Sequence, residues 1–538
     1  MADDIIALSR FAPAALAGRR AARRVEAILA DPDPEARVAA LPIQDLFFLI
    51  QEIGLADTHE LVAMATPEQV QGLIDLSSWS ASRLDDTAIV PWLEALVEAG
   101  PEKVASVWAE LDQELTALLF QRWVQVYNII EDEVPDWEEP PFIPTPDRFF
   151  MLKVLVDRPD AIRLVERLVD HLYRVDAELA RHTIRSASSE PTAELEEMSL
   201  RWRTGRMQDL GFAAFEEALE VYRPIDVGSV ASGENSEDAP REGASLPVVL
   251  AEPALKQPFL ARVLGRISQA AEAQRLESAL VVLLNRVLAA NRIEPSDTAG
   301  IATTAALGAA TLSLGLETVA RGDEARGEDT LRTVALQRLH RVGYSVTRKL
   351  GDLASVIAPR AARGEEPFLS VLAALRRPRP EFPRVLDEPP GLGTRPFAQV
   401  TDVRRATQAI GVLAAQVIIV REALEVDPGT LGAAVTLGDV ARTAMVHVAL
   451  GEAPIPTRLG VEAVRRFAAG LADGRIPEAT RAAIRAAFAD LLAAKKIAAP
   501  QEYQEALSGW MVDLERELGR LQTQAPPESR YIGGLLLE

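Results

Sequence analysis

The chain has 538 residues, of which 48% are hydrophobic and 25% are charged, a composition typical of soluble globular proteins with room for two to four domains. It contains no cysteine, which excludes disulfides, thiolate nucleophiles, cysteine-ligated zinc and iron–sulfur clusters. The formal net charge of −22 repels nucleic-acid phosphates, so we expect no nucleic-acid partner.

The first residues and the choice of basic residues indicate the compartment and the source. The sequence begins Met-Ala-Asp-Asp-Ile-Ile, and no long apolar run precedes a small-residue cleavage site, so we expect a cytoplasmic protein. Arginine greatly outnumbers lysine and alanine is abundant, a bias typical of a bacterial genome with high GC content.

Helix-start signals recur over residues 41–127. The sharpest is at Thr66, which offers an N-cap, followed by Pro67 at the first helical position and Gln69 at the third. This order satisfies backbone donors where a helix begins. The signals predict a series of short helices.

Three of these starts share one apolar pattern. After Pro67, Pro101 and Asp112, apolar residues recur at the third, sixth and seventh positions, which is the stripe of a helix packed on one side. The spacing between the starts is irregular, so this is not a strict repeat. With no convincing alternating strand pattern elsewhere, we predict an all-α, multi-domain stack of short helices, superhelical or bundle-like, without a substantial β-sheet.

Proline-rich and polar segments divide the chain. Glu131 to Pro146 is acidic and proline-rich, which indicates a connector, and Gly228 to Ser245 has little apolar content beyond small residues. The predicted segments are an N-terminal helical array (1–130), a second helical block (147–226), a flexible linker or loop (228–245), a third helical block (246–375), a proline-rich crossover (376–400), a C-terminal helical block (401–523) and a tail (524–538).

One apolar run is long enough to cross a bilayer. Ala299 to Leu316 carries no charge over eighteen residues. Its Gly, Ala and Thr content gives a poor insertion energy, so we predict a closely packed helix buried in protein and expect no membrane insertion.

The histidines do not predict a metal site. A single helix over Ala161 to Arg185 would place His171, Glu178 and His182 near one face. The two histidines would then lie about 16 Å apart along the axis, too far to share one ion. We find no nucleotide-binding loop, nucleophile elbow or zinc-protease motif, so we predict no catalytic residue, no metal ligand and no cofactor.

The stretch from Leu200 to Asp226 is rich in charged and aromatic side chains. Its arginines Arg201, Arg203 and Arg206 could cradle a phosphate or a carboxylate, because guanidinium groups suit such ligands. Alternatively they form a salt-bridge network around an aromatic core, which is the interpretation we favour.

Two resemblances follow from motif order. Leu41 to Ile50, Ala65 to Val70, Gly211 to Tyr222 and Leu312 to Glu317 resemble an uncharacterised bacterial family, domain-of-unknown-function family 6178. That resemblance covers most of the chain and implies no activity. The order of helix-start signals in the N-terminal region is also weakly similar to the cytosolic helical domain of bacterial magnesium transporters and to flagellar-switch helical domains. This similarity implies a superhelix that contacts partners or senses cations.

These observations favour a protein-interaction or regulatory scaffold whose partner is another protein of unknown identity. The alternative is a cation-responsive regulatory module that uses an acidic helical surface. An enzyme with an unrecognised helical active site is the third hypothesis, and the one we favour least.

Overall fold

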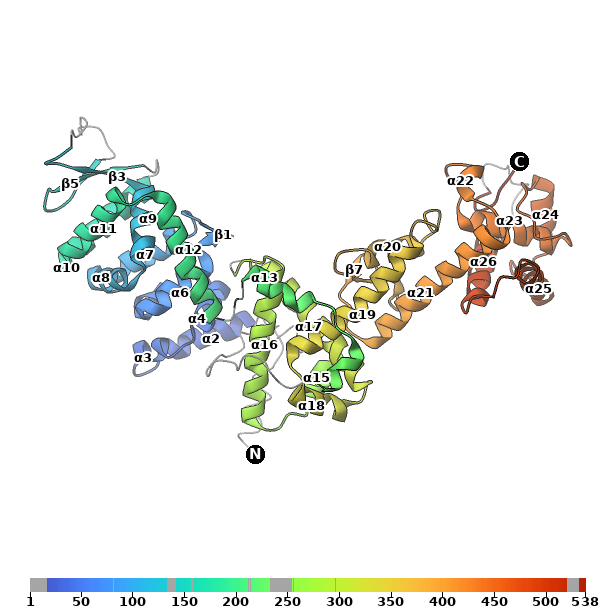
Figure 1. Ribbon diagram of the computed structural model, residues 1–538, viewed down its shortest axis with the longest axis horizontal. Helices are drawn as coiled ribbons and strands as arrows, with labels where there is room; N and C mark the ends of the chain where they lie inside the picture. Colours follow the sequence, from blue (N-terminus) through green and yellow to red (C-terminus); the bar gives the residue numbers. More distant parts are fainter. Residues whose placement is uncertain are drawn as a thin grey trace. The chain divides into compact units, whose positions relative to one another are not determined.

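In the computed structural model the chain divides into two compact units, Met1–Arg341 (the N-terminal unit) and Val342–Glu538 (the C-terminal unit) (Figure 1). Helices dominate both units, which confirms the predicted all-α class, and the strands of the described residues form only small antiparallel sheets. The structure describes residues 17–80, 82–132, 142–155, 159–210, 212, 214–232, 254, 256–295, 297–519 and 532–538.

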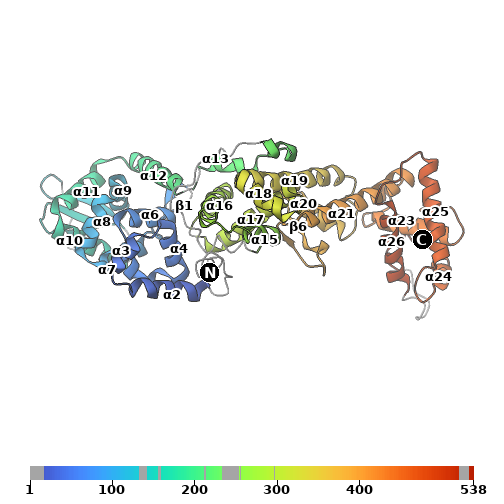
Figure 2. The same cartoon turned by 90° about the horizontal axis from the view of Figure 1, so that it is seen from below.

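The first part of the N-terminal unit is a layered array of short helices around one hydrophobic core, which extends from Val25 to Phe212. Helix α9 packs against both α11 and α12, while α10 packs against α8 (Figures 1 and 2). The helices are α2 (Ala17–Leu29), α3 (Pro34–Ala39), α4 (Ile43–Ile53), η2 (Leu55–Asp57), α5 (His59–Met64), α6 (Pro67–Ser77), α7 (Val90–Ala99), α8 (Pro101–Glu110), α9 (Gln113–Trp123), α10 (Pro159–Val175), α11 (Ala177–Ser189) and α12 (Thr192–Asp209).

The predicted helix start at Thr66 is confirmed. The Thr66 hydroxyl accepts a hydrogen bond from the Gln69 backbone N–H at 3.1 Å, and the Gln69 side chain accepts one from the Thr66 N–H at 2.8 Å. The Gln69 amide also donates to the carbonyls of Val38 and Leu41 at 2.8 and 2.9 Å. One buried side chain therefore both caps α6 and fixes the loop that leads into α4.

A three-stranded antiparallel sheet interrupts the array where the sequence predicted a connector and a helical block. Strands β3 (Val124–Asn128) and β4 (Phe142–Pro144) both pair with β5 (Phe150–Val154). The β5 sequence Phe-Met-Leu-Lys-Val is buried at four of its five positions, so it lacks the alternation that marks a half-exposed strand. The prediction that a helical block begins at residue 147 was wrong here, and helix resumes only at Pro159. A short hairpin, β1 (Trp79–Ser80) with β2 (Arg83–Leu84), follows α6.

A second hydrophobic core in the N-terminal unit extends from Ala218 to Leu339. Its helices are α13 (Phe215–Ala218), η3 (Leu219–Tyr222), η4 (Val227–Ser232), α15 (Pro258–Leu264), α16 (Ala270–Ala290), α17 (Thr298–Ala320), α18 (Glu324–Thr333) and α19 (Leu336–Ile357), the last of which continues into the C-terminal unit.

The apolar run predicted to be a buried helix lies in α17, which packs against α15, α16 and α18. Among the described residues, Ala299–Ala320 and Val400–Ala423 are long and apolar enough to cross a membrane. Of their most apolar windows, 67% and 56% respectively are buried inside the structure. Core helices of soluble proteins pass the same test, so these two helices are weak evidence for a membrane span.

The C-terminal unit is built on α21, which continues into a π-helical turn and packs against α20, α23 and α26. Its elements are α20 (Phe368–Leu375), β6 (Phe382–Pro383), η5 (Arg384–Leu386), β7 (Thr394–Arg395), α21 (Val400–Ile418), the π-helix η6 (Ile419–Ala423), α22 (Pro428–Leu431), α23 (Leu437–Ala449), α24 (Val461–Ala469), α25 (Glu478–Ala494) and α26 (Tyr503–Leu518). Strands β6 and β7 pair within the segment predicted as a proline-rich crossover.

Two predicted segments fall largely outside the described residues. The linker over 228–245 is described only as far as Ser232, and the tail over 524–538 only from Ile532. Those last residues are held in place: the Leu536 N–H donates to the Thr443 hydroxyl at 2.9 Å, and the Leu459 N–H donates to the Leu536 carbonyl at 2.8 Å.

Replacing Gln69 tests the cap and loop assignment. Gln69→Leu leaves three backbone groups without their side-chain partner, so we expect a loss of about 2–4 kcal/mol in the free energy of unfolding of the N-terminal unit. Thr66→Ala removes only the cap and should cost about 1 kcal/mol. Urea denaturation followed by tryptophan fluorescence suits this test, since six of the seven tryptophans lie between Trp79 and Trp202. Equal losses in the two variants would contradict the additional role of Gln69.

Candidate functional site

The histidines considered as metal ligands lie on two helices rather than one. His171 is on α10, whereas Glu178 and His182 are on α11, because the chain turns at Asp176 and its carboxylate caps α11. The single helix predicted over Ala161 to Arg185 was therefore wrong. Burial, followed by the nearby Arg167 charge, lowers the pKa of His171. Within the described part of the chain, no group of three or more His, Cys, Asp or Glu side chains is arranged to hold a metal ion.

The three arginines singled out in the sequence all lie on α12, in different surroundings. Arg201 is exposed. Arg203 is buried, donates from Nε to the Asp75 carbonyl at 3.0 Å, and places its guanidinium 5.3 Å from the centroid of the Trp79 ring. Arg206 lies on the same side as Arg203 and contacts the side chain of Asp75. The fold therefore brings two of the three together and leaves Arg201 apart.

The Arg206 guanidinium donates hydrogen bonds to the carboxylates of Asp75 and Asp112. It contacts both oxygens of Asp75 at 2.6 and 3.2 Å, and both oxygens of Asp112 at 2.9 and 2.7 Å. Burial raises the pKa of Asp75, which has no exposed surface, and the hydrogen bonds from Arg206 oppose that rise. Burial alone would lower the pKa of Arg206, but its bonds to the two carboxylates raise it. The guanidinium thus joins α12 to α6 and to the start of α9.

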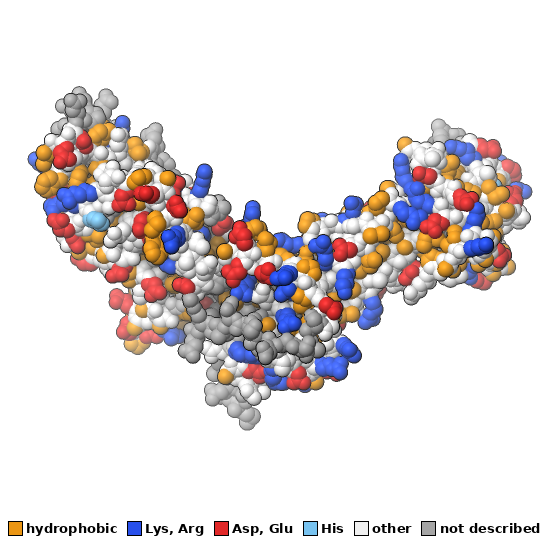
Figure 3. Space-filling model, viewed as in Figure 1, with side chains coloured by type: hydrophobic (Ala, Val, Ile, Leu, Met, Phe, Trp, Pro, Cys, Tyr) orange, Lys and Arg blue, Asp and Glu red, His pale blue; other side chains and the backbone are white. Residues whose placement is uncertain are grey.

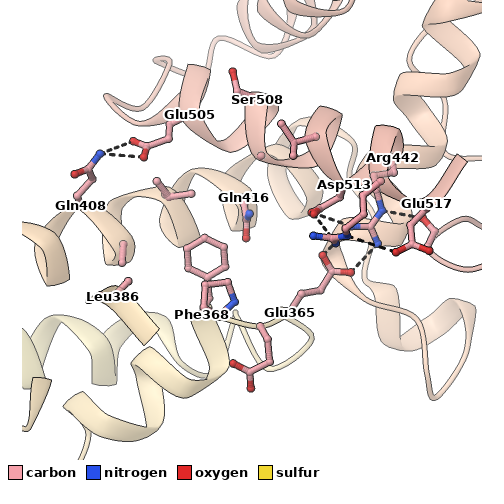
Figure 4. Close-up of a pocket in the computed structure, with 18 of the residues that line it drawn as sticks. Glu365, Phe368, Leu386, Gln408, Gln416, Arg442, Glu505, Ser508, Asp513 and Glu517 are labelled. Atoms are coloured by element: carbon pink, nitrogen blue, oxygen red, sulfur yellow. Dashed lines mark hydrogen bonds and ion pairs between the residues drawn. The ribbon is translucent and has the colours of Figure 1, made fainter. Parts of the chain in front are cut away.

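The C-terminal unit contains a cleft of about 940 Å³, here called the α21/α26 cleft (Figure 4). Side chains at helical spacing of three or four residues form its two long walls. The lining residues are Arg405, Gln408, Ala409, Val412 and Gln416 from α21; Glu505, Ser508, Gly509, Val512, Asp513, Arg516 and Glu517 from α26; and Glu365, Glu366, Pro367, Phe368, Leu386, Glu388, Asp439, Arg442, Gly533 and Gly534 from the remaining walls.

The cleft has two polar ends, and between them lies a centre of apolar side chains with the amide of Gln416 beside Phe368 (Figure 4). At one end the Gln408 amide donates to both oxygens of Glu505 at 2.9 Å. The apolar centre is lined by Phe368, Val412 and Val512, and 52% of the Val512 surface is exposed. Water in contact with these apolar surfaces is released when a ligand covers them, which favours binding.

Arg442 organises the other end of the cleft. Its side chain is 6% exposed, and it donates to both oxygens of Glu365 at 2.9 and 2.7 Å and to Asp439 at 3.0 Å. Its Nε also donates to the Gly534 carbonyl at 2.9 Å. Gly438 makes room for this arrangement, since a Cβ at that position would overlap a carboxylate oxygen of Glu365.

The carboxylates around Arg442 differ in their protonation behaviour. Burial acts against ionisation of Glu365, but its hydrogen bonds to Arg442 and Thr436 outweigh burial and lower its pKa. Asp513 lies 3.7 Å from Arg442, and there burial raises the pKa despite the nearby Arg516 and Arg442 charges. This end of the cleft therefore combines a firmly ionised pair with a carboxyl group that takes up a proton more readily.

Gln416 presents its amide to the cleft, and none of the described residues forms a hydrogen bond with that amide. It is 6% exposed, lines the cleft, and forms no side-chain hydrogen bond within the described part of the chain (Figure 4). The amide atoms are not among the described side-chain atoms that are buried without a hydrogen bond, so water in the cleft reaches them. Because no described residue is hydrogen-bonded to it, this amide is available to a ligand that enters the cleft.

Gly509 is a second feature that the chain's own packing does not explain. It lies inside α26, where glycine costs about 1 kcal/mol relative to alanine. Its φ is not positive, and an added Cβ would meet no heavy atom within 4 Å. Neither backbone conformation nor close packing requires glycine there, and its absent side chain leaves the cleft open.

The sequence predicted a helical block over 401–523 but no site within it. The sequence of α26 shows the spacing of a helix whose faces carry apolar and charged residues. Gly509, which interrupts that pattern, was the one local signal of an open surface. The partners of Arg442 could not be identified, because Glu365 and Gly534 lie 77 and 92 residues away along the chain.

Together these features define a predominantly helical protein of two compact units, the second of which carries a cleft walled by two helices. The chain belongs to the family described as "Family of unknown function (DUF6178)", which it matches over residues 10–538, as the motif order predicted. No curated protein and no solved structure matches the chain. The similarity to the magnesium-transporter domain is not shown by these comparisons.

Arg206→Met tests the charge network of the N-terminal unit. The change leaves Asp75 buried without its counter-ion, so we expect a loss of about 3 kcal/mol in the free energy of unfolding at pH 7.5. The pKa of Asp75 in the folded protein is already raised by burial, and removing Arg206 raises it further. At low pH the buried carboxyl group stays protonated and folding carries no charge penalty, whereas at higher pH the folded protein must either bury a charge or keep a proton that the unfolded chain has released. The deficit should therefore shrink at pH 5, as measured by urea denaturation. Adding Asp75→Asn should remove this pH dependence, and a deficit that is equal at both pH values would contradict the assignment.

Gln416→Leu tests whether the buried amide serves the fold. Since the Gln416 side chain has no hydrogen-bond partner among the described residues, an apolar residue of similar size should leave α21 unchanged or up to about 1 kcal/mol more stable. Hydrogen–deuterium exchange of peptides from α21 measures this local stability. Gln69→Leu is the matched contrast, because that amide is fully bonded; a similar loss in both variants would show that Gln416 has a structural role.

Proposed function

We propose that this protein is an interaction scaffold that recognises a segment of another protein in the α21/α26 cleft. One observation carries the proposal: an open cleft of about 940 Å³ has an apolar centre between two polar ends. Grooves between helices that bind peptides share this arrangement, in which apolar contacts supply affinity and polar groups fix orientation.

The composition of the cleft favours recognition over chemistry. No histidine, lysine or cysteine is among its lining residues, and Ser508 is its one side-chain hydroxyl. The carboxylates of Glu365 and Asp439 are already hydrogen-bonded to Arg442. A catalytic site needs groups poised to move protons or attack a substrate, whereas these groups hold one another in place.

The charge of the chain supports a protein partner rather than a nucleic acid. Over the visible face of the N-terminal unit, acidic side chains lie among basic and apolar ones (Figure 3), and the net charge is −22. Such a surface opposes phosphate backbones and is compatible with protein contacts. A bacterial cytoplasm is the setting that we propose, and no specific observation on the described residues favours the cation-responsive or enzymatic alternative.

Filling the cleft tests the proposed function. Gly509→Leu places a side chain in open space and should also favour the helix, so the protein is expected to remain folded. Gly205→Leu is the matched control, since Gly205 lies on α12 and an added Cβ there also meets nothing within 4 Å. In quantitative crosslinking within native host cells, we expect a partner recovered with the unmodified protein and with Gly205→Leu to fall at least tenfold with Gly509→Leu.

Circular dichroism of the purified variants checks that both keep their helix content. An identical set of partners at equal abundance for all three proteins would show that recognition does not use the cleft.

A further inference from the structure

We infer that the occupant of the α21/α26 cleft is a cationic peptide segment, with lysine or arginine flanking an apolar residue. This inference rests on the proposed function and specifies the chemistry of the partner. Three independent features of the cleft carry it: its charge, an unpaired amide and an exposed apolar centre.

The charge of the cleft is incompletely balanced. Seven carboxylates and three guanidinium groups line it. The guanidinium groups are already paired, Arg442 with Glu365 at 2.7 Å, Arg516 with Asp513 at 2.7 Å and Arg405 with Glu388 at 3.2 Å. The remaining excess of negative charge attracts a cation and repels an acidic segment.

Two carboxylates lack a cationic partner in the described part of the chain. Glu505 accepts hydrogen bonds from the neutral Gln408 amide, and Glu366 accepts one from the Ser370 backbone N–H at 3.3 Å. Both belong to the cleft lining and both are exposed, so a lysine or arginine side chain can reach them without displacing an existing ion pair.

Gln416 indicates that the cation belongs to a peptide. Its amide carries one acceptor oxygen and two donor hydrogens, the same set of groups that a peptide bond complements with its N–H and C=O. The residue is 6% exposed, and its amide lines the cleft without a hydrogen bond from the described residues, so a bound backbone can pair with it in place of water. A simple polyamine has donors only and could satisfy the oxygen alone.

The apolar centre defines what lies between the charges. Val512 on α26 is half exposed, Val412 on α21 is buried, and both line the cleft together with Phe368. An aliphatic or aromatic side chain of the bound segment would cover this surface and release its water. An occupant that pairs with Glu505 and Glu366 and also covers this apolar surface needs basic residues and an apolar residue within one short segment.

Selection from a random peptide library displayed on phage tests the inference with the full-length protein. Peptides are selected on the unmodified protein and counter-selected on Gly509→Leu, so that only binders requiring the open cleft are retained. We expect the retained pool to be enriched in lysine or arginine on both sides of an apolar residue. The most enriched peptide and its Lys/Arg→Glu counterpart are then measured by fluorescence anisotropy.

The affinities of variants separate the contributions. For the enriched peptide we expect Gln416→Leu to weaken binding about tenfold, since one or two hydrogen bonds are lost. Glu505→Gln should weaken it about threefold, and added salt should weaken it further. Glu60→Gln, an exposed carboxylate of α5, should have no effect, and the charge-reversed peptide should not bind.

Two failures have different meanings. A cleft-dependent pool without basic residues, or equal binding of the charge-reversed peptide, would overturn the cationic assignment and leave the proposed function intact. If no peptide requires the open cleft, then the proposed function fails with it. Peptide binding that is unaffected by Gln416→Leu would overturn the role of the amide in recognising a peptide backbone.

Discussion

A single buried guanidinium determines the shape of the C-terminal unit at one end of its cleft. Arg442 on α23 is bonded to Glu365 before α20, to Asp439 within its own helix and to the carbonyl of Gly534 near the last residues. Burying a charge is costly, and pairing it recovers the cost only when every donor finds an acceptor. The positions of these separate segments are therefore mutually dependent, and so is the geometry of the cleft that they enclose.

The N-terminal unit contains a comparable arrangement of one arginine between two carboxylates. Arg206 is bonded to two carboxylates, Asp75 and Asp112, which come from α6 and from the residue before α9. In both units an arginine holds helices that are distant in sequence, which a lysine could not do as well because it lacks the fixed fork of donors. The surroundings differ: Arg206 lies three residues from Arg203, which stacks on Trp79, whereas Arg442, itself only 6% exposed, lines the α21/α26 cleft.

Local signals made the helices predictable, whereas long-range contacts determined the rest. Thr66, Pro67 and Gln69 lie within one turn, so their sequence alone specifies the start of α6. Strand β5 was missed because its uniform burial hides the period of two, and the break between α10 and α11 because a single Asp at position 176 caps the second helix. The cleft was beyond prediction, since its walls come from segments that meet only after folding. Gly509 was visible in the sequence, but its significance depends on the empty space around it.

The length of the cleft wall on α26 also limits the number of partner residues that the cleft can contact. Its lining residues run from Glu505 to Glu517, which at the rise of an α-helix corresponds to about 18 Å. An extended chain covers that distance with about five or six residues. A motif of that length occurs by chance in many proteins, so discrimination between partners would depend on the spacing of charges along the segment and on contacts made elsewhere. Such short motifs are readily gained and lost during evolution, which allows a scaffold to acquire new partners without any change in its own fold.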